Sequence, residues 1–303
     1  MRDNLMMVRG GRPLSDRRAI LVSGNRWMRL SLVLQAALLA ASCAQSPLTR
    51  SGSLSSYDGL ERSDGVLTQT RFRVSKDSVL AARTVTLLPV VIADEARRSG
   101  LSAEQYALVS NTINRALCAG LSERFRVVLP SEPADLTVQS FVTALSPTDV
   151  AAAGVSSIAS IGGSVAGAVI GVPLRVPRLP IGLGGLSVEA QAVSSTKRQM
   201  AAMTWARGAD VVTTRARASE EADAYALAAE FGGDFAYLLV TGDDPIKRPA
   251  LALPSAASVG EFFGSDPKEA LCGAFGRNPG ISGVLGGIVG LPPKATDAGA
   301  ARR

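Results

Sequence analysis

The spacing of apolar positions predicts two long helices in this chain. Apolar residues recur at helical spacing across 103–125, and Ser102 with a glutamine three residues later forms a capping-box pattern. A second stripe of the same period runs through 220–240. Gly232 and Gly233 lie in the middle of that stripe and predict a weakened or bent helix.

Between and around these helices, alternating and β-branched runs predict strands. Pro89 interrupts the first apolar run and predicts a bulge or an edge position there. The last two runs flank a polar turn and predict an antiparallel hairpin. We therefore expect an α+β fold with a small, mostly antiparallel sheet packed by two long helices. The expected strands are 68–74, 84–93, 126–129, 135–145, 186–193 and 199–206.

The pattern also divides the chain into four parts. Residues 1–42 are predicted to be a signal peptide, and the Ser/Gly-rich residues 43–65 an N-terminal lipid-anchored tether. Within the tether, residues 51–57 have an ordered arm as the alternative. The α/β domain is expected over 66–245. A Gly/Pro-rich C-terminal tail, 246–303, is expected to be partly disordered, with a short helix near its Cys272.

The signal peptide has the features of a lipoprotein leader. Arg26 and Arg29 precede an apolar run, 30–41, which ends in Ser42 and Cys43. We expect cleavage between these last two residues and attachment of diacylglycerol to the Cys43 sulfur, so that the membrane is a partner through the N-terminal lipid. The alternatives are an ordinary secretory signal and an uncleaved transmembrane helix, although a run of a dozen residues is short for a span of about 20.

Two further residues bear on this leader. Met28 opens a compact signal by itself, which makes it a candidate for the true start of the protein. Ala44 follows the cysteine, where aspartate commonly signals retention in the inner membrane. The sequence therefore predicts a lipid-anchored protein of the outer membrane that faces the periplasm.

The net charge of the chain does not indicate a particular class of partner. The chain has a formal net charge of +6, and residues 1–42 contain seven arginines and two aspartates, so the remainder is close to neutral. Nucleic-acid binding requires a concentrated basic face. We therefore expect no nucleic acid among the partners.

Cysteine and histidine usage limits the chemistry. Beyond Cys43, the two cysteines Cys118 and Cys272 are a disulfide candidate in an exported protein, with two separately buried thiols as the alternative. The chain has no histidine, which excludes Ser–His and Cys–His nucleophiles and histidine-ligated zinc. No phosphate-binding loop or nucleophile elbow is present. We expect no catalytic residues, no metal and no cofactor.

Three polar or aromatic features have structural interpretations. The acidic residues Glu220, Glu221 and Asp223 open the second helix, where carboxylates complement the N-terminus. Asp243 and Asp244 are expected to form a solvated turn. Trp205 alternates within a strand and is expected to pack in the core or on a sheet face, with a platform for a ligand as the alternative.

One stretch has no charge over 25 residues. Residues 150–174 contain Gly163, Gly167 and Gly171 at spacings of four, which permit close helix approach in membranes. A flexible or weakly helical Gly/Ser/Ala insert is the alternative. Whether this stretch touches the membrane is left open by the sequence.

Five stretches between Ser51 and about residue 245 carry a family resemblance. They are SGSLSSYDGL at 51–60, TVTLLPV at 84–90, RALCAGLSERFRVV at 115–128, ADLTVQSFVTALSPTD at 134–149 and GGLSVEAQAV at 184–193. With these stretches the chain resembles an uncharacterised bacterial lipoprotein family, domain of unknown function 3313. The resemblance implies an envelope lipoprotein facing the periplasm and brings no known activity or site residues.

These observations favour a non-enzymatic envelope lipoprotein that binds or scaffolds an envelope protein partner of unknown identity. One alternative is an accessory or pore-forming component of an envelope transport assembly, which would use two Gly-rich apolar stretches, 150–174 and 280–291, at the membrane. The other is a histidine-independent hydrolase that acts on the cell wall or on lipid. The fold class alone does not decide between them.

Overall fold

The computed structural model describes residues 46–154, 181–211, 213–248, 259–260 and 262–297. The chain divides into two units, Met1–Cys43 and Ala44–Arg303, and every described residue belongs to the second. The predicted signal peptide and most of the uncharged stretch therefore lie outside the described residues.

Among the described residues, eight strands form one mixed sheet in the order β1-β2-β8-β7-β6-β3-β5, with β4 beside β6. The run from β1 to β6 in that order is antiparallel throughout. The strands are β1 (Glu61–Arg62), β2 (Thr68–Val74), β3 (Thr84–Leu87), β4 (Val91–Ile92), β5 (Arg126–Val127), β6 (Leu136–Ser146), β7 (Gly185–Ser194) and β8 (Gln199–Gly208).

The far edge of the sheet is parallel. β3 pairs in parallel with both β5 and β6, and β4 also pairs in parallel with β6. Helix α4 (Ala103–Ser122) lies between β3 and β5 in the chain and provides the crossover that neighbouring parallel strands require. The predicted mostly antiparallel sheet fits the longer strands. The parallel edge was not predicted, because it depends on where α4 packs.

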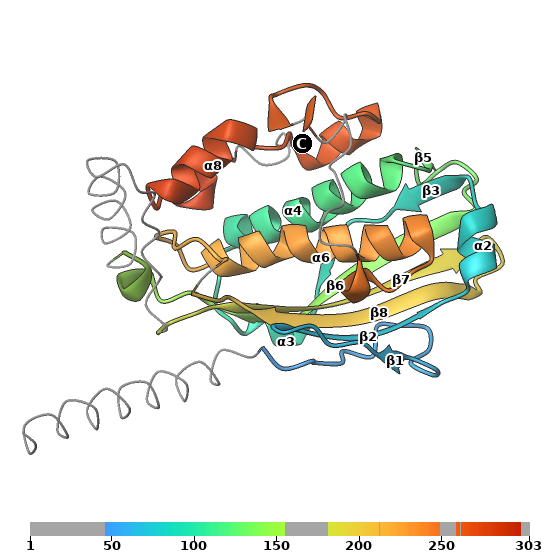
Figure 1. The fold of residues 1–303 in the computed structure, drawn as a ribbon, viewed down its shortest axis with the longest axis horizontal. Helices are drawn as coiled ribbons and strands as arrows, with labels where there is room; N and C mark the ends of the chain where they lie inside the picture. The colour runs from blue at the N-terminus through green and yellow to red at the C-terminus, as the bar shows by residue number, and fades with distance from the viewer. Residues whose placement is uncertain (1–45, 155–180, 212, 249–258, 261, 298–303) are drawn as a thin grey trace, which may run out of the picture. The chain divides into compact units, whose positions relative to one another are not determined.

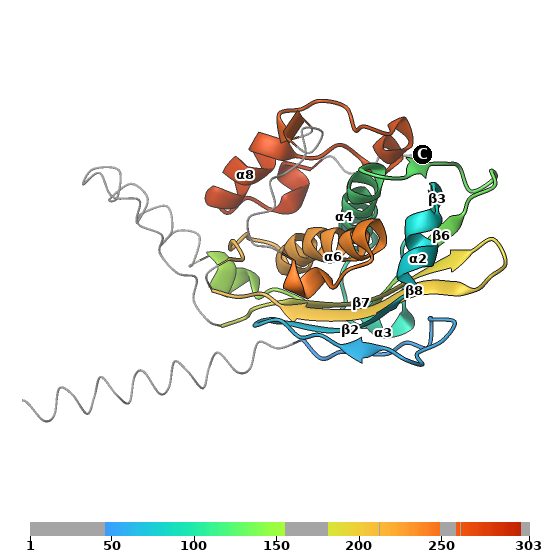
Figure 2. The same ribbon diagram turned by 45° about the vertical axis from the view of Figure 1, so that its right-hand side comes forward.

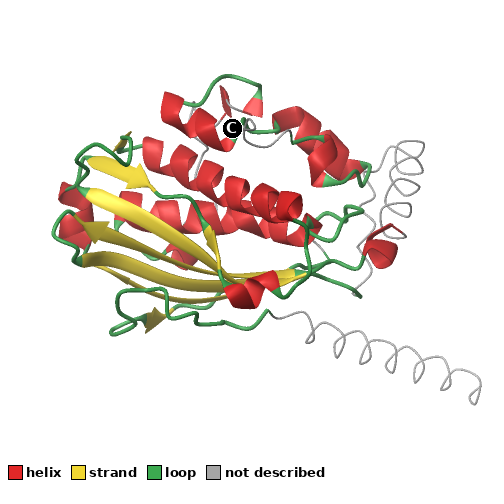
Figure 3. Cartoon of the chain, turned by 180° about the vertical axis from the view of Figure 1, so that it is seen from behind, coloured by secondary structure: helices red, strands yellow, loops and turns green. Residues whose placement is uncertain are grey.

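Two long helices cover one face of this sheet, as predicted. Figures 1 and 2 show α4 and α6 (Ala222–Thr241) together over the strands, and Figure 3 shows the same two layers from behind. Trp205 of β8 meets Phe231 of α6 edge to face at 5.7 Å between ring centroids, and Phe231 stacks on Phe235. All three aromatic side chains are fully buried and form the centre of the core.

The helix ends follow local sequence signals only in part. The predicted capping box is confirmed, because Gln105 N–H donates to Ser102 Oγ and Ser102 N–H donates to Gln105 Oε1. Helix α6 begins at Ala222, two residues later than predicted. The carbonyl of Glu220 instead accepts a hydrogen bond from Thr148 N–H at 2.8 Å, which ties the preceding turn to another part of the chain.

Glycines allow α4 and α6 to approach closely. A Cβ added at Gly232 would meet Ala116 Cβ at 2.5 Å, and one added at Gly120 would meet Ala236 Cβ at 2.5 Å. Helix α6 continues through Gly232 and Gly233 without interruption, although the pair was predicted to weaken or bend it. Packing against α4 compensates for the low helix propensity of glycine.

This contact predicts opposite effects for two neighbouring substitutions. We expect Gly232→Ala to lower the free energy of unfolding by about 1–3 kcal/mol, because the new methyl group overpacks the helix interface. Gly233→Ala is the control: no atom lies within 4 Å of an added Cβ, so alanine should stabilise the helix by about 0.5–1 kcal/mol. Urea titrations of both variants measure the difference, and equal effects would contradict the role given to Gly232.

The apolar run predicted as one strand over 84–93 is two short strands. β3 ends at Leu87 and β4 begins at Val91, so the residues around Pro89 form no ladder. Proline lacks the N–H that a sheet ladder requires, which explains the interruption. The hairpin of β7 and β8 lies where it was predicted, with Lys197 in the turn at φ 64°.

The C-terminal segment carries ordered elements that pack on α4. Figure 1 shows α8 (Gly280–Ile288) on the side of α4 that faces away from the sheet. The helix expected near Cys272 is the 3₁₀ helix η3 (Ala270–Phe275), which contacts α4. The remaining helical elements are α2 (Lys76–Ala81), α3 (Asp94–Arg97), η2 (Pro245–Lys247) and η4 (Pro293–Ala295).

Candidate functional site

The face of the sheet opposite α4 and α6 is polar at its centre. Alternation along β7 turns Ser187, Glu189 and Gln191 to this face, while the intervening residues enter the core. Gln191 Nε2 donates to Gln139 Oε1 of β6 at 2.8 Å, and Gln199 Nε2 of β8 donates to Gln191 Oε1 at 2.9 Å. A row of three amides therefore crosses three strands, and the Glu189 carboxylate lies on the same face of β7, two residues away from Gln191.

The N-terminal arm, residues 46–60, covers this polar face. Tyr57 donates its hydroxyl to the Glu189 carboxylate at 2.8 Å, and Ser51 Oγ donates to Glu189 Oε2 at 2.8 Å. Ser55 N–H donates to Gln191 Oε1 at 2.8 Å. Glu189 is completely buried beneath these donors. Residues 51–57 therefore form the ordered arm that was the alternative prediction. They lie within the segment that was expected to be a tether.

Burial and the Glu189 carboxylate together raise the pKa of the Tyr57 phenol. The phenol therefore keeps its proton and remains a donor to Glu189 near neutral pH. Arg50 lies over the Tyr57 ring, with its guanidinium carbon 5.2 Å from the ring centroid. These contacts hold the arm in place against the sheet.

The arm begins close to the predicted lipid attachment point. Ser46 is 6% exposed, and a Cβ added at Gly185 would come within 2.9 Å of Ser46 Cβ. Cys43 precedes Ser46 by three residues. Ser42 and Cys43 lie outside the described residues, so their cleavage and lipidation stay predictions.

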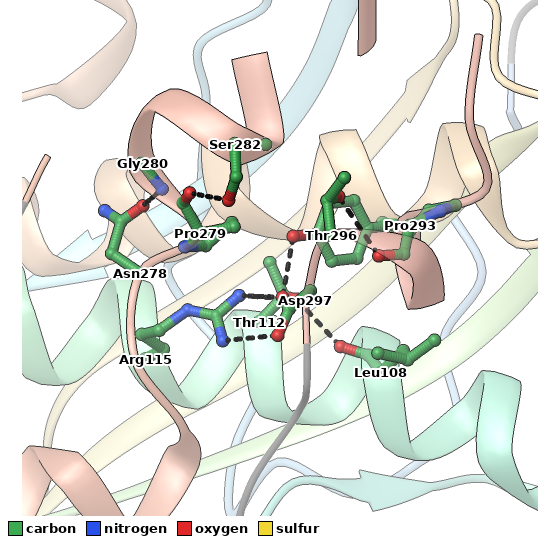
Figure 4. A network of polar contacts seen from close by, with 12 residues as sticks. Leu108, Thr112, Arg115, Asn278, Pro279, Gly280, Ser282, Pro293, Thr296 and Asp297 are labelled. Atoms are coloured by element: carbon green, nitrogen blue, oxygen red, sulfur yellow. Dashed lines mark hydrogen bonds and ion pairs between the residues drawn. The ribbon is translucent and has the colours of Figure 1, made fainter. Parts of the chain in front are cut away.

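A buried ion pair fastens the end of the described chain to α4 (Figure 4). Arg115 Nη2 lies 2.6 Å from Asp297 Oδ2, and both side chains are almost fully buried. Arg115 also donates to Thr112 Oγ1, whose hydroxyl in turn donates to the Leu108 carbonyl. A buried charge pair of this kind is stable only while both partners are present.

A tyrosine of α6 completes this cluster. Tyr225 donates its hydroxyl to Asp297 Oδ2 at 2.7 Å. Burial, followed by the Asp297 carboxylate, raises the pKa of Tyr225, so the phenol remains protonated. The residues Arg115, Tyr225 and Asp297, called the C-terminal clasp below, thus join both long helices to the last described residue.

The predicted disulfide is present in the structure. Cys118 of α4 and Cys272 of η3 are bonded, with 5.6 Å between their Cα atoms, and both residues are buried. This separation lies in the ordinary range for disulfides. The bond and the C-terminal clasp hold the same C-terminal segment at two places along α4.

Comparison with known proteins identifies the family. Residues 49–235 match the family described as Protein of unknown function (DUF3313). The chain belongs to the DUF3313 family. The matched range contains most of the N-terminal arm, the hairpin and α4, but it ends before Cys272 and Asp297. The family resemblance is thus confirmed, while lipid attachment stays a prediction.

Other comparisons add little to the DUF3313 assignment. No curated protein matches the chain. Two solved structures of the PelC dodecamer from Paraburkholderia phytofirmans, one of them a variant, are similar at TM-scores of 0.32, with 10% and 9% sequence identity. Each similarity covers 58% of this chain and 98% of that chain.

The acidic residues at the start of α6 have structural partners in this DUF3313 protein. Asp223 accepts a hydrogen bond from Gly184 N–H at 2.7 Å, and Glu221 accepts one from Gln105 Nε2 at 2.8 Å. Glu221 also lines a groove of about 330 Å³ beside the first turn of α4, together with Ser102 and Lys294. The carboxylates join separate segments, in addition to lying at a helix N-terminus as predicted.

The remaining residues that the sequence singled out also have structural partners. Asp243 pairs with Lys76 at 2.6 Å, and Asp244 accepts a hydrogen bond from Ser63 Oγ at 2.6 Å. Trp205 is buried in the core, where its indole N–H donates to Asp234 at 3.0 Å. Burial raises the pKa of Asp234, against the opposing effect of Arg248.

Within the described part of the chain, no group of three or more His, Cys, Asp and Glu side chains is placed to hold a metal ion. In that same part, no helix is both long and apolar enough to cross a membrane.

Sequence reasoning missed Glu189, Tyr57 and Asp297. A signal for Glu189 exists, because alternation in the hairpin strand places this carboxylate in the middle of a sheet face. A central carboxylate on such a face requires partners when another segment covers it. Asp297 has no comparable local signal, because its partner Arg115 lies 182 residues away.

Proposed function

We propose that this DUF3313 protein is a lipid-anchored protein of the bacterial outer membrane that faces the periplasm and binds or scaffolds another envelope component without catalysis. The observation that carries the proposal is the leader itself, a basic start and an apolar run that end at Ser42 and Cys43. The docked arm begins three residues later, which suits an anchor placed directly on a folded domain.

The partners of the buried carboxylates support a role without catalysis. Glu189 holds the arm, Asp223 holds the loop before β7, and Asp297 holds the C-terminal segment. Each carboxylate accepts hydrogen bonds from donors elsewhere in the chain, as expected of groups that stabilise a fold. These three acidic side chains are used in joining segments of the fold, which supports the non-catalytic part of the proposal.

Replacing Cys43 with serine tests the anchor. We expect Cys43→Ser to lose all incorporation of a clickable fatty acid and to move from the membrane to the soluble periplasmic fraction. Several acyl chains give stable anchoring, at about 0.8 kcal/mol for each buried methylene. Cys272→Ser is the control, because a cysteine bonded within the domain should not affect labelling. Equal labelling of wild type and Cys43→Ser would overturn the proposal.

The binding role is tested with the lipidated chain. Crosslinking in intact cells, followed by purification from separated inner and outer membranes, should recover a defined envelope protein with the outer-membrane fraction. The Cys43→Ser protein is the comparison, because it retains the folded domain and lacks the anchor. Recovery of the wild-type chain from the inner membrane, or without any crosslinked partner, would contradict this function.

A further inference from the structure

The position of Ser46 limits where a lipid on Cys43 can lie. Three residues of extended chain span at most about 11 Å. Ser46 is buried against Gly185, the first residue of β7. An acyl chain attached at Cys43 would therefore enter the membrane close to the start of β7. The end of the domain around Gly185 would then be the part of the fold nearest to that membrane.

Several elements meet at this end of the sheet. Gly185 pairs with Ser146, the last residue of β6, and with Gly208, the last residue of β8. Asp223, in the first turn of α6, accepts a hydrogen bond from Gly184 N–H. Figure 1 shows α2 at the opposite end of the long helices, where Lys76 pairs with Asp243 beyond the end of α6.

Exposed apolar side chains lie at this same end. Val150 is 40% exposed and Ile181 is 58% exposed, and a hydrogen bond from Asp149 N–H to the Gly182 carbonyl holds their two segments together. Large apolar side chains exposed in neighbouring segments are typical of an interaction surface.

The end of α8 extends this apolar region. Thr148 N–H donates to the Glu220 carbonyl at 2.8 Å, and Ala218 N–H donates to the Gly290 carbonyl at 3.0 Å. The turn before α6 thus links the segment of Val150 to the residues that follow α8. The last residue of α8 and two residues that follow it expose further apolar side chains, Ile288 at 43%, Val289 at 47% and Leu291 at 44%.

We propose that this anchor-side surface, formed by Val150, Ile181, Ile288, Val289 and Leu291, lies on the lipid surface to which Cys43 attaches the chain. The inference rests on the proposed lipid attachment and adds which surface the membrane covers. The short connection from Cys43 to Ser46 selects a membrane as the occupant, because it keeps the bilayer within reach of these side chains.

The charged side chains nearby indicate whether the anchor-side surface needs anionic lipid to bind a membrane. Asp149 and Glu220 are exposed beside this surface, and so are Arg215 and Lys294. Because both signs are present, apolar contact and the anchor would provide the attraction, rather than a basic patch that binds anionic lipid. A membrane of zwitterionic phosphatidylcholine should therefore cover the surface.

Tryptophan fluorescence on the full lipidated chain tests the proposal. Val150→Trp and Ile181→Trp place reporters on the anchor-side surface. Leu80→Trp on α2 is the matched control, because Leu80 is 41% exposed against 40% for Val150 and lies at the opposite end. Trp205 is buried in every variant and supplies a constant background. Each protein is purified from membranes and reconstituted in phosphatidylcholine vesicles, with or without bromine on the acyl chains.

We expect brominated lipid to remove the added emission of Val150→Trp and Ile181→Trp and to leave that of Leu80→Trp unchanged. If brominated lipid does not quench the two reporters while acrylamide does, the surface faces water and the proposal is overturned. If neither quenches them, a protein or a second copy of the chain covers the surface, which also overturns it. Equal quenching of Leu80→Trp would also overturn the proposal, because the membrane would then cover no particular surface of the domain.

A flotation experiment tests lipid attachment at Cys43 separately from the surface assignment. Wild-type protein should float with the vesicles in a density gradient, and Cys43→Ser should not. Loss of this difference would overturn lipid attachment at Cys43 together with the present inference. Cys43-dependent flotation without quenching at positions 150 and 181 would overturn the surface assignment alone. A thermal unfolding transition in each variant shows that the added tryptophan lies in a folded domain.

Discussion

Replacing both Cys118 and Cys272 with serine is expected to lower the free energy of unfolding by about 2–5 kcal/mol. The bond closes a long loop, since its cysteines lie 154 residues apart, and a crosslink across a long loop restricts the unfolded chain strongly. It also fastens η3 to α4, so its loss should release the first part of the C-terminal segment. Urea unfolding of the Cys43→Ser protein, with and without the two further substitutions, measures the change.

Reduction provides the control for this experiment. Reductant should destabilise the Cys43→Ser protein by the same amount and should leave the variant without cysteines unaffected. Without reductant, alkylation followed by mass spectrometry should find neither Cys118 nor Cys272 free. Free thiols at both positions in periplasmic protein, or equal stability of the two proteins, would contradict the bond.

Removing the Asp297 carboxylate is expected to cost about 3–5 kcal/mol of unfolding free energy. Asp297→Ala leaves the Arg115 guanidinium buried without the carboxylate it pairs with at 2.6 Å. It also removes the acceptor of the Tyr225 hydroxyl. A buried charge that loses its partner keeps its desolvation cost, which is why the effect should be large.

An exposed ion pair in the same C-terminal segment is the matched control. Arg277 and Asp266 also lie 2.6 Å apart, but their side chains are 73% and 75% exposed. Asp266→Ala should cost about 1 kcal/mol or less, because water solvates the arginine that remains. Similar losses for the two variants would show that burial does not determine the strength of the C-terminal clasp.

The sequence alone predicts those features that depend on neighbouring residues. The helix over 103–122 has its stripe and capping box within one stretch of chain, and the hairpin has alternating strands on either side of a polar turn. The family resemblance and the export leader are likewise local patterns. The disulfide could also be predicted from the sequence, because only Cys118 and Cys272 remain to pair once Cys43 is assigned to the lipid.

Only the tertiary structure decided the contacts between distant parts of the chain. Tyr57 and Glu189 lie 132 residues apart, and Arg115 and Asp297 lie 182 residues apart. The parallel edge of the sheet depends on the path of α4, and the close approach of Gly232 to Ala116 depends on how two helices cross. A buried charge is favourable only when an opposite charge lies beside it. A glycine in a helix is likewise favourable only when another helix packs closely against it. Which partner that is depends on the path of the folded chain, and a local pattern carries no information about that path.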